Sequence, residues 1–171
     1  YYTAELGIAY EMPSSYEVDV PLSFEQGLNI VYNDSIQDLN KDLNDLDKVG
    51  LKNMKVILSV DNAVPLKLQL KAENVQIKDV YGNELSAVKK TIEEDKQYVA
   101  ESADGEKPAT SELVLNLTSD DTAFLSKIDR ICFKITAVTG TTTGVPLKDT
   151  QWLKITSIKL SVPGGVNVDL N

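Results

Sequence analysis

The sequence predicts a mainly β protein, an antiparallel β-sandwich, and two observations support this. Most apolar residues lie in short runs rich in Val, Ile, Thr and Tyr, which alternate with polar residues and are separated by Pro, Gly, Asn and Asp. The chain has 171 residues, of which 42% are hydrophobic and 25% charged, the composition of one folded domain with a sizeable core. We therefore expect a single domain over residues 1–171, of the immunoglobulin-like or Greek-key type.

Ten strands are expected, and turn signals separate several of them. Gly82 and Asn83 mark a turn, and Pro163–Gly165 joins the last two strands as in a hairpin. Residues 101–110 are expected to form a mobile loop. The expected strands are 4–10, 16–22, 28–32, 52–60, 66–72, 75–81, 112–118, 130–139, 153–162 and 166–170.

One amphipathic helix is expected over residues 35–49, because apolar residues recur there at steps of three and four. Asp34 or Ser35 can cap its start and Gly50 can end it. A short helical connector is expected near residues 125–128. The apolar positions of the longer helix are Ile36, Leu39, Leu43 and Leu46.

The two halves of the sequence resemble an internal repeat. Each half is expected to contain a strand, a helical connector and a second strand, followed by the sequence Val-Pro-Leu-Lys. This sequence stands at Val64–Lys67 and at Val145–Lys148. Chance similarity is one explanation. The other is two strand–connector–strand units whose connectors close the ends of the sandwich.

Charge and histidine content exclude several functions. The chain has 26 acidic and 17 basic residues, no histidine and a net charge of -9. Residues 1–50 form an acidic segment with 10 acids and 2 bases, and residues 51–171 hold the remaining strands of the sandwich. The net charge disfavours nucleic acid as a partner. The lack of histidine removes every Ser-His-Asp and Cys-His arrangement, so we expect no enzyme activity, no catalytic residue and no cofactor.

Metal and carboxylate sites are not expected either. The acids and amides from Asp38 to Asn44 have the spacing of an EF-hand loop, but Leu43 replaces the glycine and Val49 the glutamate that the loop needs. Glu93–Asp95 and Asp120–Asp121 are sequence neighbours, which is not the arrangement of a glycosidase pair. Cys132 is the only cysteine and is expected to pack as a small hydrophobic residue.

Three aromatic residues are candidate ligand contacts: Trp152, Tyr81 and Tyr98. Flat rings with polar tips suit the stacking of sugars. The alternative is packing in the core or at strand edges, which the aromatic content of only 6% favours. Asn33–Ser35 and Asn116–Thr118 match the acceptor pattern for N-glycosylation, a pattern that is frequent by chance.

Four segments resemble an uncharacterised group of exported cell-envelope proteins of Bacteroidetes, often lipoproteins, that carry a β-sandwich domain. The resemblance implies a location in the cell envelope, whether anchored to the outer membrane, periplasmic or at the cell surface, and a lipid anchor upstream of Tyr1. It also implies O-glycosylation at Ser35 or Thr122, for which helix capping is the alternative. The segments are Val20–Phe24, Asp61–Leu70, Asp79–Glu84 and Pro163–Leu170.

Together these features predict a non-catalytic binding or structural module of a bacterial envelope protein, with recognition by loops such as 101–110 and 139–144. The partner would be a glycan or another envelope protein, and no stretch is apolar enough to span a membrane. One alternative is a carbohydrate-binding accessory subunit of a polysaccharide-utilisation system. Another is a pilus or adhesin subunit, with residues 166–170 as the donor strand.

Overall fold

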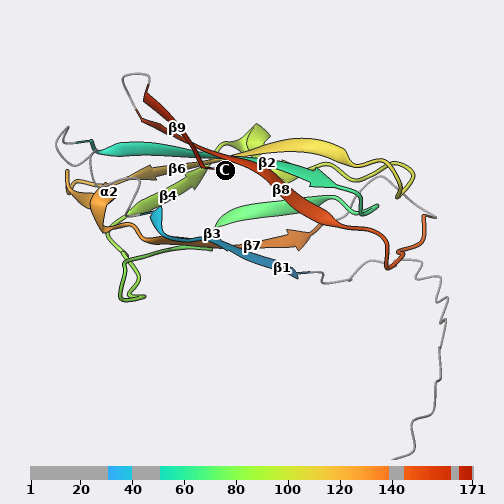
Figure 1. Cartoon of the computed structure of the whole chain (residues 1–171), viewed down its shortest axis with the longest axis horizontal. Coiled ribbons are helices and arrows are strands. Elements are labelled where there is room, and N and C mark those ends of the chain that lie inside the picture. The colour runs from blue at the N-terminus through green and yellow to red at the C-terminus, as the bar shows by residue number, and fades with distance from the viewer. Residues whose placement is uncertain (1–30, 40–50, 139–144, 163–165, 171) are drawn as a thin grey trace, which may run out of the picture.

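The computed structural model describes residues 31–39, 51–138 and 145–162, and the backbone of residues 166–170. These residues form a mainly β structure of two antiparallel sheets with few helices (Figure 1). The strands are β1 (Val31–Ile36), β2 (Asn53–Asn62), β3 (Leu68–Lys78), β4 (Lys89–Ile92), β5 (Tyr98–Val99), β6 (Ala109–Thr118), β7 (Arg130–Ala137), β8 (Leu153–Val162) and β9 (Val166–Leu170). The helical elements are η2 (Glu94–Lys96) and α2 (Phe124–Lys127).

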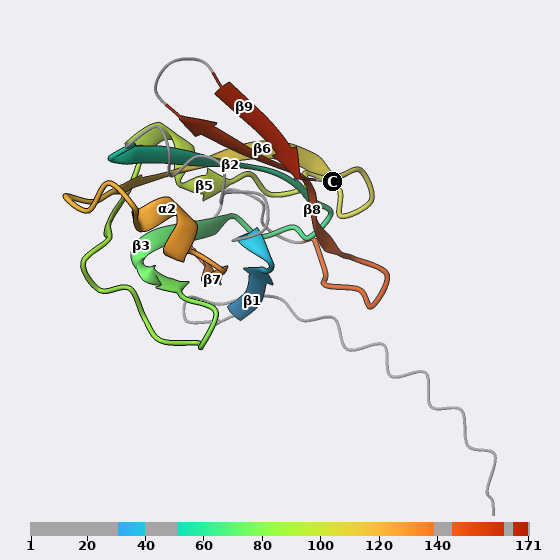
Figure 2. The same cartoon turned by 60° about the vertical axis from the view of Figure 1, so that its left-hand side comes forward.

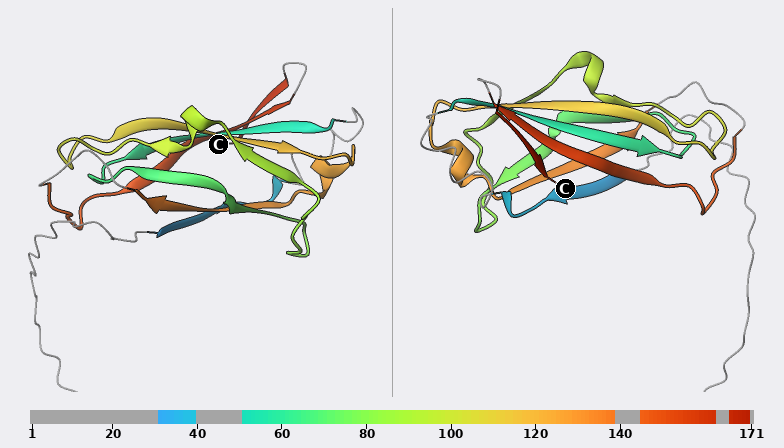
Figure 3. Two further views of the ribbon diagram at one scale, coloured as in Figure 1. Left: turned by 180° about the vertical axis from the view of Figure 1, so that it is seen from behind. Right: turned by 45° about the horizontal axis from the view of Figure 1, so that its top comes forward.

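The two sheets lie as facing layers, which is clearest when the molecule is seen from behind (Figure 3). Sheet A has the strand order β1-β7-β3-β5, and sheet B the order β4-β6-β2-β8-β9. The described strands therefore confirm the prediction of a mainly antiparallel, sandwich-like fold.

Alternating side chains build the core between the sheets. In β2, Met54, Val56, Leu58 and Val60 are buried, while the residues between them face outwards. Strand β7 repeats this pattern in sheet A, and both strands contribute to one continuous hydrophobic cluster. Burial of one face of each sheet fixes the register of the strands, because a slip by one residue would expose the core side chains.

The predicted strands agree best with the structure in its second half. The predictions for 153–162 and 166–170 have the observed bounds, and those for 52–60, 112–118 and 130–139 have one or both bounds displaced by one to three residues. The predictions for 66–72 and 75–81 were wrong to place two strands, because β3 is continuous across a bulge. Strands β4 and β5 were missed, and both are short strands at the edges of their sheets. The predictions for 4–10 and 16–22 lie outside the described residues.

The start of the predicted helix 35–49 was wrong. Ser35 and Ile36 belong to β1, where they pair with Cys132 and Ile131 of β7. The strand ends at Ile36, Asp38 has a φ of 61°, and Leu39 has helical backbone. Residues 40–50 lie outside the described part of the chain. The alternating pattern of a strand and the three-to-four-residue spacing of a helix would both bury Ile36. Pairing of β1 with β7 therefore decides that this segment is a strand.

The shorter predicted elements agree more closely with the structure. The connector expected near 125–128 is α2, which begins one residue earlier. The expected turn after β3 is present, with Gly82 at a φ of +83°. Residues 101–108 of the expected loop 101–110 lie outside any helix or strand, and residues 109 and 110 begin β6. Within this loop Ser102 is fully buried, and its hydroxyl donates to the Lys107 carbonyl at 2.7 Å.

The strands of the two predicted units pair reciprocally. Strand β1 pairs with β7 and β6 pairs with β2, so the first strand of each unit pairs with the second strand of the other. Two reciprocal hydrogen bonds accompany these pairs: Leu39 N–H donates to the Asp129 carbonyl, and Ser119 N–H to the Lys52 carbonyl, both at 3.0 Å. Since Asp129 lies just after α2, the end of β1 and α2 lie at the same end of the sandwich (Figure 2).

Candidate functional site

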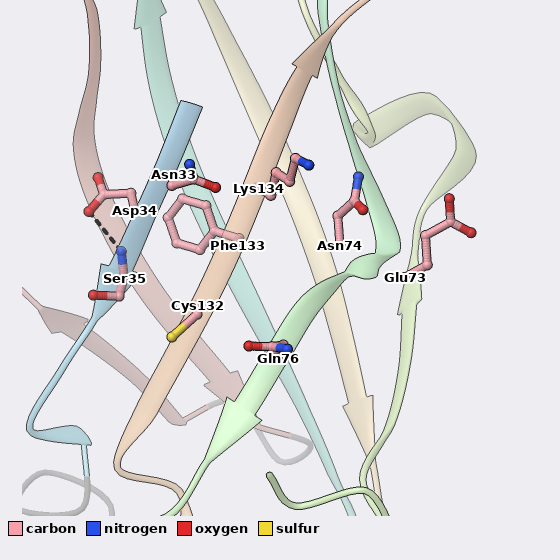
Figure 4. A pocket seen from close by; sticks show the side chains of 9 residues that line it. All are labelled: Asn33, Asp34, Ser35, Glu73, Asn74, Gln76, Cys132, Phe133 and Lys134. Atoms are coloured by element: carbon pink, nitrogen blue, oxygen red, sulfur yellow. Dashed lines mark hydrogen bonds between the residues drawn. The ribbon is translucent and has the colours of Figure 1, made fainter. Parts of the chain in front are cut away.

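A groove of about 530 Å³ lies on the outer face of sheet A, across β1, β7 and β3 (Figure 4). We call it the sheet A groove. Most of the side chains around it are polar. Its lining consists of Asn33, Asp34, Ser35, Glu73, Asn74, Gln76, Cys132, Phe133 and Lys134.

Strand alternation directs the polar side chains into the groove. Asn33 pairs with Lys134 and Ser35 pairs with Cys132, and these residues face away from the core that Phe133 enters. Since alternate residues point to opposite faces, the outer residues of neighbouring strands lie side by side. Cys132 was expected to pack as a hydrophobic residue, but it is half-buried at this surface.

The bulge in β3 shapes the opposite wall. Leu70 pairs with Ile135 and Val75 with Phe133, so the four residues 71–74 of β3 stand opposite Lys134 alone. This extra length places Glu73 and Asn74 beside the groove. Bulges often re-aim side chains next to binding sites.

Four of the lining side chains are unengaged within the described part of the chain. No hydrogen bond or ion pair joins the carboxamides of Asn33, Asn74 and Gln76, or the ammonium group of Lys134, to another side chain or to the backbone there. A carboxamide can donate and accept hydrogen bonds at the same time. The groove therefore offers both donors and acceptors to a ligand, on the rigid support of a sheet.

The two carboxylates at the groove are not arranged as a catalytic pair. Asp34 accepts hydrogen bonds from the Tyr32 hydroxyl at 2.8 Å and from Ser35 N–H at 2.7 Å. Burial, together with the hydrogen bond to Asp34 and its charge, raises the pKa of Tyr32 to about 12. Glu73 stands on the opposite wall with 75% of its side chain exposed. The Asp34 carboxylate is thus hydrogen-bonded to residues of its own strand, and the Glu73 carboxylate is exposed to solvent.

The structure does not gather the three predicted aromatic contacts. Tyr81 is 85% exposed in the turn after β3. Tyr98 lies on β5 at the other end of β3, where the Lys67 ammonium is 4.3 Å from its ring centre. Trp152 precedes β8, and its carbonyl accepts from Ala63 N–H at 2.9 Å. None of the three lines the sheet A groove.

The predicted modification sites differ in their surroundings. Ser35 is half-buried in β1, and its hydroxyl accepts from the Gln37 amide at 3.1 Å. Thr122 is exposed in the loop before α2, where Asp121 accepts from Ala123 N–H at 3.0 Å. The N-cap of α2 is Ala123, and no described side chain donates or accepts a capping hydrogen bond there, so the capping alternative weighed for Thr122 is not what the structure shows.

Among the described residues, no cluster of three or more Asp, Glu or Cys side chains could hold a metal ion. None of the described helices is long and apolar enough to cross a membrane. Comparisons with models of protein families, with curated proteins and with solved structures gave no match. The functional argument therefore depends on the groove itself.

Proposed function

We propose that this protein is a non-catalytic binding module of a bacterial cell-envelope protein and that the sheet A groove is its binding surface. The observation that carries the proposal is the convergence of three unengaged carboxamides, Asn33, Asn74 and Gln76, from two strands onto one groove. Binding surfaces commonly present a small number of well-placed polar groups on a preformed scaffold. The scaffold in this proposal is an immunoglobulin-like or Greek-key sandwich.

The lining favours a glycan over an apolar peptide. Carboxamides, a hydroxyl and an ammonium group match the hydroxyl groups of a sugar, whereas the only large apolar residue, Phe133, is buried beneath the groove. Among the described residues, no exposed aromatic ring lines the groove, so recognition would depend on hydrogen bonds rather than stacking. This places the proposal closest to a carbohydrate-binding accessory subunit of a polysaccharide-utilisation system.

Location and anchoring in the proposal come from the sequence resemblance alone. An envelope location and an upstream lipid anchor are compatible with an exposed polar face, but they are independent of the groove. The pilus or adhesin alternative has less support. Its donor strand, β9, pairs with β8 over all five of its residues and would have to leave its own sheet.

A glycan array followed by calorimetric titration of the best-binding oligosaccharide tests the proposal. The variant N33A/Q76A removes one carboxamide from each wall, and we expect it to weaken binding at least ten-fold. Asn53→Ala is the matched control, because Asn53 is an exposed amide on a strand of the other sheet. Absence of binding to every glycan, or equal affinity of both variants, would refute the proposal.

A further inference from the structure

The reciprocal pairing of the two units places one similar pair of side chains on each outer face. On sheet A, Asn33 pairs with Lys134, and on sheet B, Asn116 pairs with Lys55. Lys55, Asn116 and Lys134 alternate with buried core residues and therefore face outwards, and Asn33 is exposed on β1. Each asparagine is followed two positions later by a hydroxyl residue, Ser35 or Thr118. This correspondence also explains why both segments match the same Asn-x-Ser/Thr pattern.

On sheet B this pair holds a carboxylate of the protein itself. Lys55 Nζ lies 2.7 Å from Oε1 of Glu93, and the Asn116 side chain is a lesser cause of the lowered pKa of Glu93. The hydrogen bond from Lys55 is the largest cause that lowers the pKa of Glu93. Glu93 reaches this position because β4 flanks β6 and ends just before it. Lys55, with Asn116 opposite it, is thus paired with a carboxylate of the protein itself.

On sheet A the same pair has no internal carboxylate within the described part of the chain. No described strand flanks β1 on its outer side, so nothing there corresponds to β4. Asp34 is bound by Tyr32 and by the Ser35 backbone, and Glu73 has an ion pair with Lys71 at 3.9 Å. Asn33 and Lys134 instead line the sheet A groove, side by side (Figure 4).

We infer that Asn33 and Lys134 bind the carboxylate of an acidic sugar, such as a uronic acid residue of a glycan. This inference rests on the proposed function and adds the chemical class of the ligand. The carboxylate takes the place that Glu93 has on sheet B, and Asn74 and Gln76 on the opposite wall meet the sugar hydroxyls. One lysine matches one carboxylate, and the net charge of -9 disfavours a long polyuronate.

NMR titration of the ¹⁵N-labelled full chain tests this inference with three probes. These are methyl glucuronide, methyl glucoside and the peptide acetyl-Ala-Ala, which carries a carboxylate without a sugar. We expect the glucuronide to bind about five-fold more tightly than the glucoside, since a partly exposed ion pair contributes about a factor of five. Lys134→Gln removes that preference, and the control Lys154→Gln, at an exposed lysine of β8, keeps it.

A second variant tests the symmetry argument. Glu93→Gln removes the internal carboxylate from sheet B, so methyl glucuronide should then also shift the amides near Lys55 and Asn116. Equal binding of glucuronide and glucoside would overturn this inference and leave the proposed function standing. Binding of acetyl-Ala-Ala in preference to both sugars would overturn the choice of sugar. Binding of no probe by the native chain or by Glu93→Gln would count against both the inference and the proposed function.

Discussion

Asn62 is a buried amide whose hydrogen bonds hold the end of the sandwich where β2 ends. Its side chain is fully buried, and its Nδ2 group donates to the carbonyls of Leu66 and Ala100, both at 2.9 Å. Its Oδ1 atom accepts from Val64 N–H, also at 2.9 Å. We predict that Asn62→Ala destabilises the protein strongly, because it removes three hydrogen bonds and leaves their backbone partners unpaired.

At about 1 kcal/mol for each bond, the loss is about 3 kcal/mol. For a chain of this length it corresponds to a decrease in Tm of roughly 6 to 12 °C. Urea unfolding followed by circular dichroism measures the free energy of unfolding, and the m-value should stay constant. Asn53→Ala, an exposed position on the same strand, should cost less than about 0.5 kcal/mol. A loss below about 1 kcal/mol in Asn62→Ala would refute the reasoning.

Three further predictions concern other parts of the molecule. Spectrophotometric titration should show Tyr32 ionising near pH 12, and Asp34→Asn should lower the pKa of Tyr32. Because the pKa of Tyr32 in the folded protein exceeds the unfolded value of about 10, the stability of the protein falls as the pH rises from about 10 to about 12. An unchanged pKa of Tyr32 in Asp34→Asn would contradict this prediction. Phe124→Ala should cost about 3 to 5 kcal/mol in urea unfolding, because the ring is 1% exposed, and a loss under 1 kcal/mol would show that α2 does not close the core. Hydrogen bonds from the Asn83 side chain and from neighbouring backbone N–H groups lower the pKa of Asp79, so the contribution of Asp79 to stability is present above about pH 4 and is lost in more acidic solution. Asp79→Asn should therefore reduce the loss of stability that the protein shows as the pH falls below about 4. An unchanged loss of stability in this variant would count against the prediction.

Local patterns predicted the strands wherever alternation and turn residues agreed. Strand β8 alternates on either side of a one-residue shift at its bulge opposite Ser59 and Val60, and the Pro-Gly-Gly pattern after it predicted the antiparallel pairing of β8 with β9. The start of the predicted helix failed at Ile36, because Ile36 and Leu39 fit helical spacing while pairing with β7 favours a strand. Strand β4 was missed because Lys89–Ile92 is short and lies at a sheet edge, where charged residues are common.

The sheet A groove was not predicted from the sequence. Its walls come from residues that are distant in the chain, and only the register of β1 with β7 and the bulge in β3 bring Asn33, Asn74 and Lys134 together. The sequence carried one usable signal, the repeated Asn-x-Ser/Thr pattern, but its meaning depends on the lysine opposite each asparagine. Trp152, Tyr81 and Tyr98 were instead predicted from the sequence as ligand contacts. The strand topology places these three residues apart from one another and outside the groove.

The central claim is that recognition takes place on the strands of sheet A rather than in the loops at the ends of the sandwich. Chemical-shift mapping of the full chain with its best-binding glycan tests this claim most directly. We predict that the largest shifts fall on residues 31–36, 73–76 and 132–134. Shifts confined to the turn at 101–108 or to residues 145–152, with those three segments unchanged, would contradict the claim.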